Sequence, residues 1–240
     1  MVRPVERKKS LPSRVWGARQ AYLFLLPLLA GLLVFNYYPF FSGLYHSLFD
    51  WDAVGTATFI GLDNFKELFS DPDFLSTIPT LFKIAIPKIL ISIFVPLIAA
   101  EMIFAVRSDK AQRAYRVIVL LPMVAPGVVM MLLWKYIYDP NAGVLTAVLR
   151  TLGILGEEQV INWLGDPNWV IFSIVFMYFP WIGGTSVLIY MSGLINISTE
   201  IIESTRLDGA NTFQRIWHVD IPLLMGQIRY FLIFGIIGNL

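Results

Sequence analysis

The polar stretch IIESTRLDGANTFQRIWHVDIPLL, residues 201–224, lies between two strongly apolar segments. On its N-terminal side, residues 167–199 contain no Asp, Glu, Lys or Arg. On its C-terminal side the chain reads YFLIFGIIGNL over residues 230–240. Because a helix needs about 20 mostly apolar residues to cross a bilayer, both neighbours are candidate membrane crossings. The polar stretch is then expected at a membrane surface.

The composition is that of an integral membrane protein. Hydrophobic residues make up 57% of the chain, charged residues 15%, and the mean hydropathy is +0.67; soluble domains carry about 25% charged residues. A net charge of +1 gives no basic field for nucleic acid. The absence of Cys excludes disulfides and thiolate sites, and with only two His we expect no metal site.

The predicted fold is an all-α membrane protein, a polytopic helical bundle with five visible spans. These spans cover residues 21–44, 79–104, 115–138, 168–192 and 223–240. Lys83 and Lys88 interrupt the second span near one end, from which their side chains can snorkel to the headgroups. The fifth span is short, so we expect it to be truncated and the natural chain to continue.

The distribution of basic residues predicts the orientation of the chain. Most of the 18 Lys and Arg residues lie before the first span, between the second and third, and in or after the polar stretch. Basic residues favour the cytoplasmic side, so the N-terminus and the polar stretch are both predicted to be cytoplasmic. Residues 1–20 then form a cytoplasmic N-terminal segment and residues 21–240 the transmembrane domain. The first span is interpreted as a signal anchor rather than a cleaved signal peptide.

The polar stretch carries the signals of two short helices. Ser198 is a predicted N-cap, and Gly209 supplies the left-handed residue that closes a helix. Asn211 and Gln214 have capping-box spacing, and Pro222 is expected to prevent simple continuation into the fifth span. Residues 199–221 are therefore predicted to form a helix-turn-helix. Its mixed charges favour docking into a protein groove over lying in the headgroups, where Lys and Arg dominate.

The spacing within this stretch resembles a known motif. Glu203 is followed six residues later by Gly209, and then by Val219, Ile221 and Pro222. This pattern is similar to the cytoplasmic motif of ABC importer permeases, E-A-A, three residues, G, nine residues, I-x-L-P. The departures are small or conservative.

Two alanines of that motif are replaced here by Ser204 and Thr205, and the isoleucine and leucine by Val219 and Ile221. Three further stretches resemble permeases of the carbohydrate type within the binding-protein-dependent transport system inner membrane component family. They are YLFLLPLLAGLLVFNYYPF, FIGLDNFKELF and YRVIVLLPMVAPGVVMMLLWKYIYDPNAG. The likeness covers residues 22–240, and in that family a sixth span follows.

The resemblance implies a transport subunit that is not itself an enzyme and has no catalytic residues. The chain contains no G-x-x-x-x-G-K-S/T phosphate loop. No cofactor is therefore expected in this chain: ATP and Mg would be bound by a cytoplasmic ATPase subunit, present in two copies. A second, homologous permease and an extracellular or periplasmic solute-binding protein complete the implied complex, in the plasma membrane of a bacterium or archaeon.

By the same resemblance, the helix-turn-helix couples transport to the ATPase. Ile202, Phe213 and Ile216 are the expected apolar anchors. The coupling residues predicted in this way are Glu203, Ser204, Thr205, Arg206, Asp208, Gly209, Ala210, Phe213, Arg215 and Pro222.

Candidate solute contacts come from the apolar spans. Sugars are bound by aromatic stacking together with hydroxyl and amide groups. The candidates are Trp134, Tyr178, Trp181, Thr185 and Ser186, for each of which ordinary helix packing is the favoured alternative. Glu101, near the inner end of the second span, is interpreted as an interfacial carboxylate paired with Arg107 or Lys110 rather than a gate.

The alternatives to a sugar importer are another solute, another transport mechanism, an enzyme and a scaffold. A permease of the same class could carry glycerol phosphate or another polar solute. An ion-coupled secondary transporter would need buried charges at mid-membrane, which the three clearest spans lack. A membrane enzyme would need a catalytic constellation, and no Ser-His, paired-Asp or H-E-x-x-H arrangement is visible. A structural scaffold leaves the spacing of Glu203, Gly209 and Pro222 unexplained.

Overall fold

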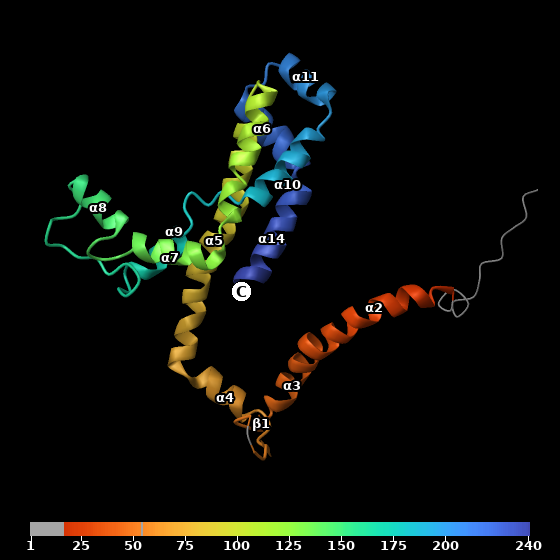
Figure 1. The fold of residues 1–240 in the computed structure, drawn as a ribbon, viewed down its shortest axis with the longest axis vertical. Helices are drawn as coiled ribbons and strands as arrows, with labels where there is room; N and C mark the ends of the chain where they lie inside the picture. The colour runs from red at the N-terminus through yellow and green to blue at the C-terminus, as the bar shows by residue number, and fades with distance from the viewer. Residues whose placement is uncertain (1–16, 54) are drawn as a thin grey trace, which may run out of the picture. The chain divides into compact units, whose positions relative to one another are not determined.

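The computed structural model describes residues 17–53 and 55–240, which are mainly helical (Figure 1). Most of the predicted N-terminal segment 1–20 lies outside the described residues. The chain divides into two compact units, Met1–Ser76 and Thr77–Leu240, and each is described by itself.

The first unit contains one long apolar helix. It is built from α2 (Arg19–Leu32), the π-helical η1 (Leu33–Tyr37) and α3 (Tyr38–His46), and runs unbroken over 28 residues. Its length and composition suit the predicted span 21–44. A two-stranded antiparallel hairpin follows, β1 (Phe49–Asp50) with β2 (Thr58–Phe59), and then α4 (Asp63–Ser70).

Helix α5 (Pro72–Phe104) starts in the first unit and continues through the second. At 33 residues it is longer than the predicted span 79–104 and runs through three internal prolines. Its buried residues Ala85, Ile89, Ile93, Leu97 and Ala100 recur every three or four positions. This is the spacing of one helix face, so α5 packs against the rest of the second unit along a single stripe.

The predicted span 115–138 is not one straight helix. Helix α6 (Asp109–Ile118) and the 3-10 turn η2 (Leu121–Val124) meet α7 (Gly127–Ile137) at 86°. Pro122 and Pro126 lie in this connection, where proline removes backbone donors and bends the chain. Helix α8 (Val144–Thr151) follows in the loop after α7.

The predicted span 168–192 is also divided. Helix α9 (Val170–Phe176) and α10 (Gly184–Ile195) are separated by residues 177–183, which include a cis peptide bond before Pro180. Tyr178 and Trp181 adopt left-handed backbone conformations there. Among the described residues, two helices are long and apolar enough to cross a membrane, and up to five segments if each bent pair is one span. The number of crossings stays a prediction.

The core of the second unit joins α5, α10 and α14 (Met225–Asn239), which Figure 1 shows gathered in one bundle. Val187, Tyr190 and Leu194 of α10 are completely buried. They pack with Leu97 and Ala100 of α5, and Ile228 and Phe231 of α14 lie against the same cluster.

The polar stretch forms two helices at one end of this bundle. The first is α11 (Thr199–Leu207), and the second is continuous through α12 (Thr212–Arg215), the π-helical η3 (Ile216–Asp220) and α13 (Ile221–Leu223). Pro222 was predicted to prevent simple continuation into the fifth span. The helix passes through Pro222 and ends at Leu223, and the chain then bends by 68° at Leu224 before α14 begins. A π-turn is wider than an α-turn, and here it ends at Asp220, two residues before the proline.

Candidate functional site

The candidate site is the polar hairpin, residues 199–223, whose two helices start where the sequence predicts. The hydroxyl of Ser198 accepts a hydrogen bond from the Ile201 N–H at 3.4 Å. Asn211 and Gln214 form a complete capping box: each side chain accepts from the other residue's N–H, at 2.8 and 2.9 Å. The first turn of both helices is therefore stabilised locally.

The turn between the helices depends on Gly209. Its φ of +75° lies in the left-handed region, as predicted. The Gly209 N–H donates to the carbonyl of Arg206 at 3.1 Å, and the Ala210 N–H donates to that of Thr205 at 3.2 Å. These two bonds form a Schellman motif, which satisfies carbonyls that the helix end leaves free. The angle between the helices is thus set by backbone geometry.

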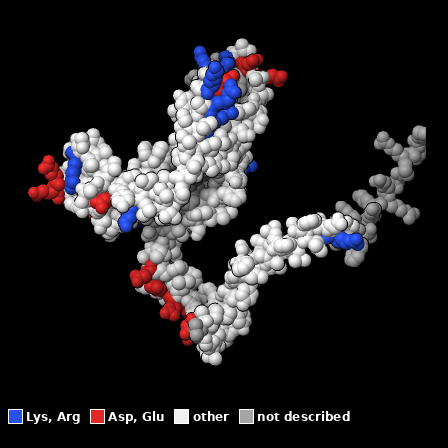
Figure 2. All heavy atoms as spheres, viewed as in Figure 1, with Lys and Arg blue, Asp and Glu red and all other residues white. Residues whose placement is uncertain are grey.

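One face of the hairpin is open and mixes charged with apolar side chains. Glu203, Arg206 and Asp208 are exposed. Leu207 is 88% exposed and Phe213 73%, and the Phe213 ring stacks with that of Trp217, their centroids 6.5 Å apart. Ser204, Gly209 and Pro222 are exposed as well. Figure 2 shows blue and red spheres together at this end of the second unit.

The opposite face of the hairpin packs against the bundle. Thr205 is buried, and its hydroxyl donates to the Ile201 carbonyl at 2.7 Å. Ile202 is half-buried against the main core, and Ile216 is half-buried too. Of the three predicted apolar anchors, only Phe213 is therefore on the open face. Ile202 and Ile216 are partly covered by the permease itself, and their role as anchors stays a prediction, because helical periodicity shows that a face is apolar but not which neighbour covers it.

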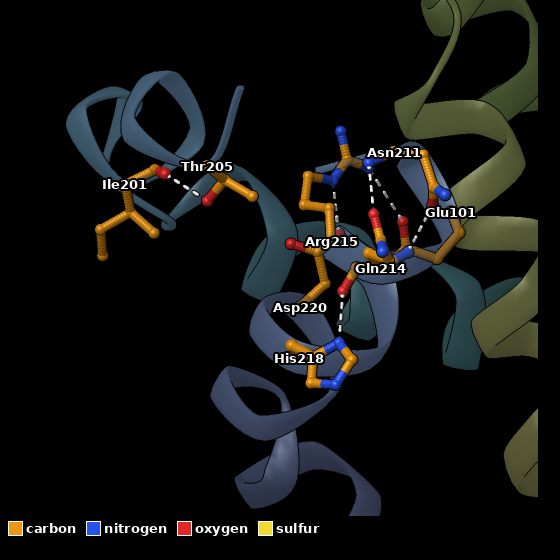
Figure 3. A network of polar contacts seen from close by, with 8 residues as sticks. All are labelled: Glu101, Ile201, Thr205, Asn211, Gln214, Arg215, His218 and Asp220. Carbon is orange, nitrogen blue, oxygen red and sulfur yellow. Dashed lines mark hydrogen bonds and ion pairs between the residues drawn. The ribbon is translucent and has the colours of Figure 1, made fainter. Parts of the chain in front are cut away.

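Arg215 also turns inward, although its charge was predicted to face a partner. Its Nε donates to Oδ2 of Asp220 at 2.9 Å, and its Nη2 lies 3.5 Å from Oε2 of Glu101 on α5 (Figure 3). Its guanidinium carbon lies 5.6 Å from the centre of the Phe104 ring, also on α5. We call Glu101, Arg215 and Asp220 the ion triad. Glu101 is thus paired with Arg215, and not with either of the nearby residues that the sequence suggested.

The π-helix explains how Arg215 and Asp220 meet. Residues three or four apart share a face of an α-helix, whereas these two are five apart. The π-helical turn Ile216–Asp220, with its wider spacing, lies between them. No sequence signal marks this turn, so sequence reasoning missed Asp220 as a member of the site.

A cleft of about 630 Å³ lies between the hairpin and the loop after α5. Three arginines line it, Arg107 from the loop and Arg206 and Arg215 from the hairpin. The other lining residues are Thr205, Ala210, Asn211 and Thr212. The positive charge of Arg215 is directed to the two triad carboxylates, which leaves Arg107 and Arg206 as the exposed cations of the cleft.

The predicted solute contacts lie away from the hairpin. Trp134 is buried, and its ring is 6.3 Å from that of Tyr178; Phe176 packs between Trp134 and Trp181. The Trp181 Nε1 donates to the carbonyl of Val175 at 3.0 Å. These three aromatics thus form one cluster and are engaged in packing.

Thr185 and Ser186 are at the start of α10 and belong to a different contact. The hydroxyl of Thr185 lies 3.7 Å from the sulfur of Met123. Nothing in these contacts tests a role in solute binding, so all five residues stay predictions.

The loop after α7 is held by Asp139. Its Oδ1 accepts hydrogen bonds from the N–H groups of Ala142 at 2.8 Å and Asn141 at 3.0 Å. These bonds favour the ionised form and lower the pKa of the Asp139 carboxyl.

Comparison with known proteins places the chain in a family. The profile of the family described as "Binding-protein-dependent transport system inner membrane component" matches residues 92–240, which include α10, the polar hairpin and α14. The chain belongs to this family. It is an ABC importer permease of a family of multi-pass inner membrane components.

Relatives and solved structures agree with this assignment. The probable ABC transporter permease protein YurN of Bacillus subtilis is 35% identical over 206 residues, covering 84% of this permease and 68% of YurN. The multiple sugar-binding transport system permease protein MsmF of Streptococcus mutans is 29% identical, covering 95% and 75%.

The fold is shared with a crystallised bacterial alginate ABC transporter in complex with an alginate pentasaccharide-bound periplasmic protein. The TM-score is 0.78 at 23% identity, covering 95% of this permease and 74% of that chain.

Proposed function

We propose that this permease forms, with a second permease, the pathway for a sugar or oligosaccharide. An extracellular binding protein delivers the solute, and a separate cytoplasmic ATPase drives its transport by docking onto the polar hairpin. The observation that carries the proposal is the open face of the hairpin, where the apolar Leu207, Phe213 and Trp217 are exposed together with the charged Glu203, Arg206 and Asp208.

The chemistry of this face suits a protein groove. Exposed aromatic and aliphatic side chains supply the apolar anchors of an interface, and interspersed charges of both signs supply its specificity. The Schellman turn and the capping box hold the two helices at a defined angle before any partner binds, which lowers the cost of ordering them on docking. A rigid docked element can transmit motion produced by ATP hydrolysis elsewhere.

The proposals of a carbohydrate solute and of a binding protein are supported by similarity to known transporters. MsmF is named for multiple sugar transport. The alginate transporter with the same fold is bound to a periplasmic protein that carries an oligosaccharide. These relationships support a carbohydrate as the solute, and an uptake assay with labelled oligosaccharides and labelled glycerol phosphate separates it from the alternative solute class.

The docking proposal is tested by co-purification and by labelling. The tagged permease is expected to co-purify with an ATP-binding subunit, and Phe213→Ala is expected to weaken that association.

Because the chain contains no Cys, Phe213→Cys provides a unique thiol in the permease. It should react with a membrane-impermeant maleimide only from the cytoplasmic side, and should be protected when the ATPase is bound. A matched control, Leu152→Cys, is 65% exposed in the loop after α7 and should react from the opposite side. Phe213→Cys reacting from outside, or no ATP-binding subunit with the purified permease, would refute the proposal.

A further inference from the structure

The ion triad connects three segments of the second unit through one side chain. Glu101 belongs to α5, Arg215 ends α12 and Asp220 ends the π-helix η3. The Arg215 side chain is 12% exposed, that of Glu101 7%, and that of Asp220 is fully buried. Figure 3 shows Arg215 between the two carboxylates, with its guanidinium directed toward α5.

Two features make this contact directional rather than a diffuse charge pairing. A guanidinium is planar, so the hydrogen bond from its Nε to Asp220 and the ion pair of its Nη2 with Glu101 together restrict its orientation. Phe104 lies close to the same guanidinium, at 5.6 Å, in the range of a cation–π contact. Arg215 is therefore held by polar and aromatic groups of α5 on one side and by Asp220 on the other.

The triad also depends on its single cation. Two buried carboxylates share one guanidinium. Both oxygens of Glu101, Nη2 of Arg215 and Oδ1 of Asp220 have no hydrogen-bond partner in the described part of the chain, so Glu101 and Arg215 are held by charge alone. Removal of the cation would leave both carboxylates without a counter-charge, which strongly disfavours the packed arrangement. Loss of Arg215 is thus expected to weaken the attachment of the hairpin to α5, leaving only the apolar contacts of its inner face.

We propose that Arg215 is a positioning residue that fixes the polar hairpin against α5, so that displacement of the hairpin by the ATPase moves α5 and the bundle core with it. The path from the hairpin to the core is short: Glu101 lies one residue after Ala100, and Ala100 packs in the main core with Tyr190 and Leu194. This inference rests on the proposed function, because it requires that an ATPase acts on the hairpin. It adds that Arg215 acts from inside the permease and does not contact the ATPase.

The test measures solute molecules transported per ATP hydrolysed, in the full complex reconstituted with its binding protein. The variants are Arg215→Met, Arg215→Lys and Glu101→Gln. Arg215→Met is expected to reduce the ratio by about tenfold, within the usual range of coupling free energies. Arg215→Lys retains the positive charge but not the planar guanidinium, so its ratio is expected to lie between those of Arg215→Met and the wild type. Arg113→Met and Arg113→Lys are matched controls on an exposed arginine of α6, and should keep the wild-type ratio.

The readout separates this inference from a purely structural role and from failure of the proposed function. A structural role would lower yield and melting temperature but leave the ratio per assembled complex unchanged. Wild-type ratios in Arg215→Met and Glu101→Gln complexes would overturn the inference, as would failure of all three variants to assemble. Absence of ATP-dependent transport in the wild-type complex would instead reject the proposed function.

Discussion

Nη2 of Arg215 lies 3.5 Å from Oε2 of Glu101, so a residue of the polar hairpin is paired with a residue of the long helix α5. Both side chains are buried, and one guanidinium serves two carboxylates. Substituting Arg215 and substituting Glu101 should therefore reduce stability by different amounts. Arg215→Met removes the only cation of the ion triad and should destabilise the permease by about 3–5 kcal/mol. Glu101→Gln removes one of the two carboxylates and should destabilise the permease less than Arg215→Met does. Apparent melting temperatures of the purified complexes measure the stability of the two variants. Equal decreases in melting temperature would contradict the buried pairing.

Gly184 is expected to tolerate no side chain, because a backbone group occupies the space beside it. A Cβ at this position would lie 2.4 Å from the carbonyl oxygen of Val119 and 3.1 Å from Cα of Leu120. Gly184→Ala must therefore shift backbone and should cost about 1–3 kcal/mol. Gly127→Ala is the control, since a Cβ there meets nothing within 4 Å. Thermal unfolding in detergent measures both, and equal stability of the two variants would show that the close approach at Gly184 does not exist.

Glu203→Lys and Gly209→Pro should uncouple ATP hydrolysis from transport without preventing membrane insertion. The first reverses a charge on the open face of the hairpin. The second demands a φ near −65° where the turn has +75°, and so destroys the Schellman motif. Uptake and membrane abundance are measured together. Glu157→Lys, an exposed acidic residue of the loop after α8, is the matched charge-reversal control. Wild-type uptake in both hairpin variants would contradict a coupling role.

The contribution of the loop after α7 to stability is expected to depend on pH through Asp139. The hydrogen bonds from Ala142 and Asn141 lower its pKa in the folded protein below the usual value of an aspartate. Its contribution to stability is therefore present above the unfolded pKa and is lost as the pH falls through the folded pKa. Asp139→Asn should be less stable than wild type at neutral pH, and the difference should shrink below about pH 4. A difference that stays constant from pH 7 to pH 3 would show that ionised Asp139 does not hold the loop.

Local features of the polar hairpin could be read from the sequence. The Ser198 cap, the capping box of Asn211 and Gln214, and the left-handed Gly209 were all predicted, and the structure confirms them. Each depends on groups only a few residues apart, so their geometry follows from backbone chemistry and hardly depends on the rest of the fold. The spacing of Glu203, Gly209 and Pro222 likewise indicated the family that the comparisons confirm.

The tertiary structure alone decided which face of the hairpin is open and which charges are paired. Glu101 has basic residues close by in sequence, yet its partner is Arg215, because packing of α12 against α5 brings them together. A π-helical turn adds Asp220, and the helix runs through Pro222 to bend at Leu224. Hydrophobic periodicity places side chains on helix faces, but it does not specify which faces meet, since that choice depends on how segments distant in the chain pack together.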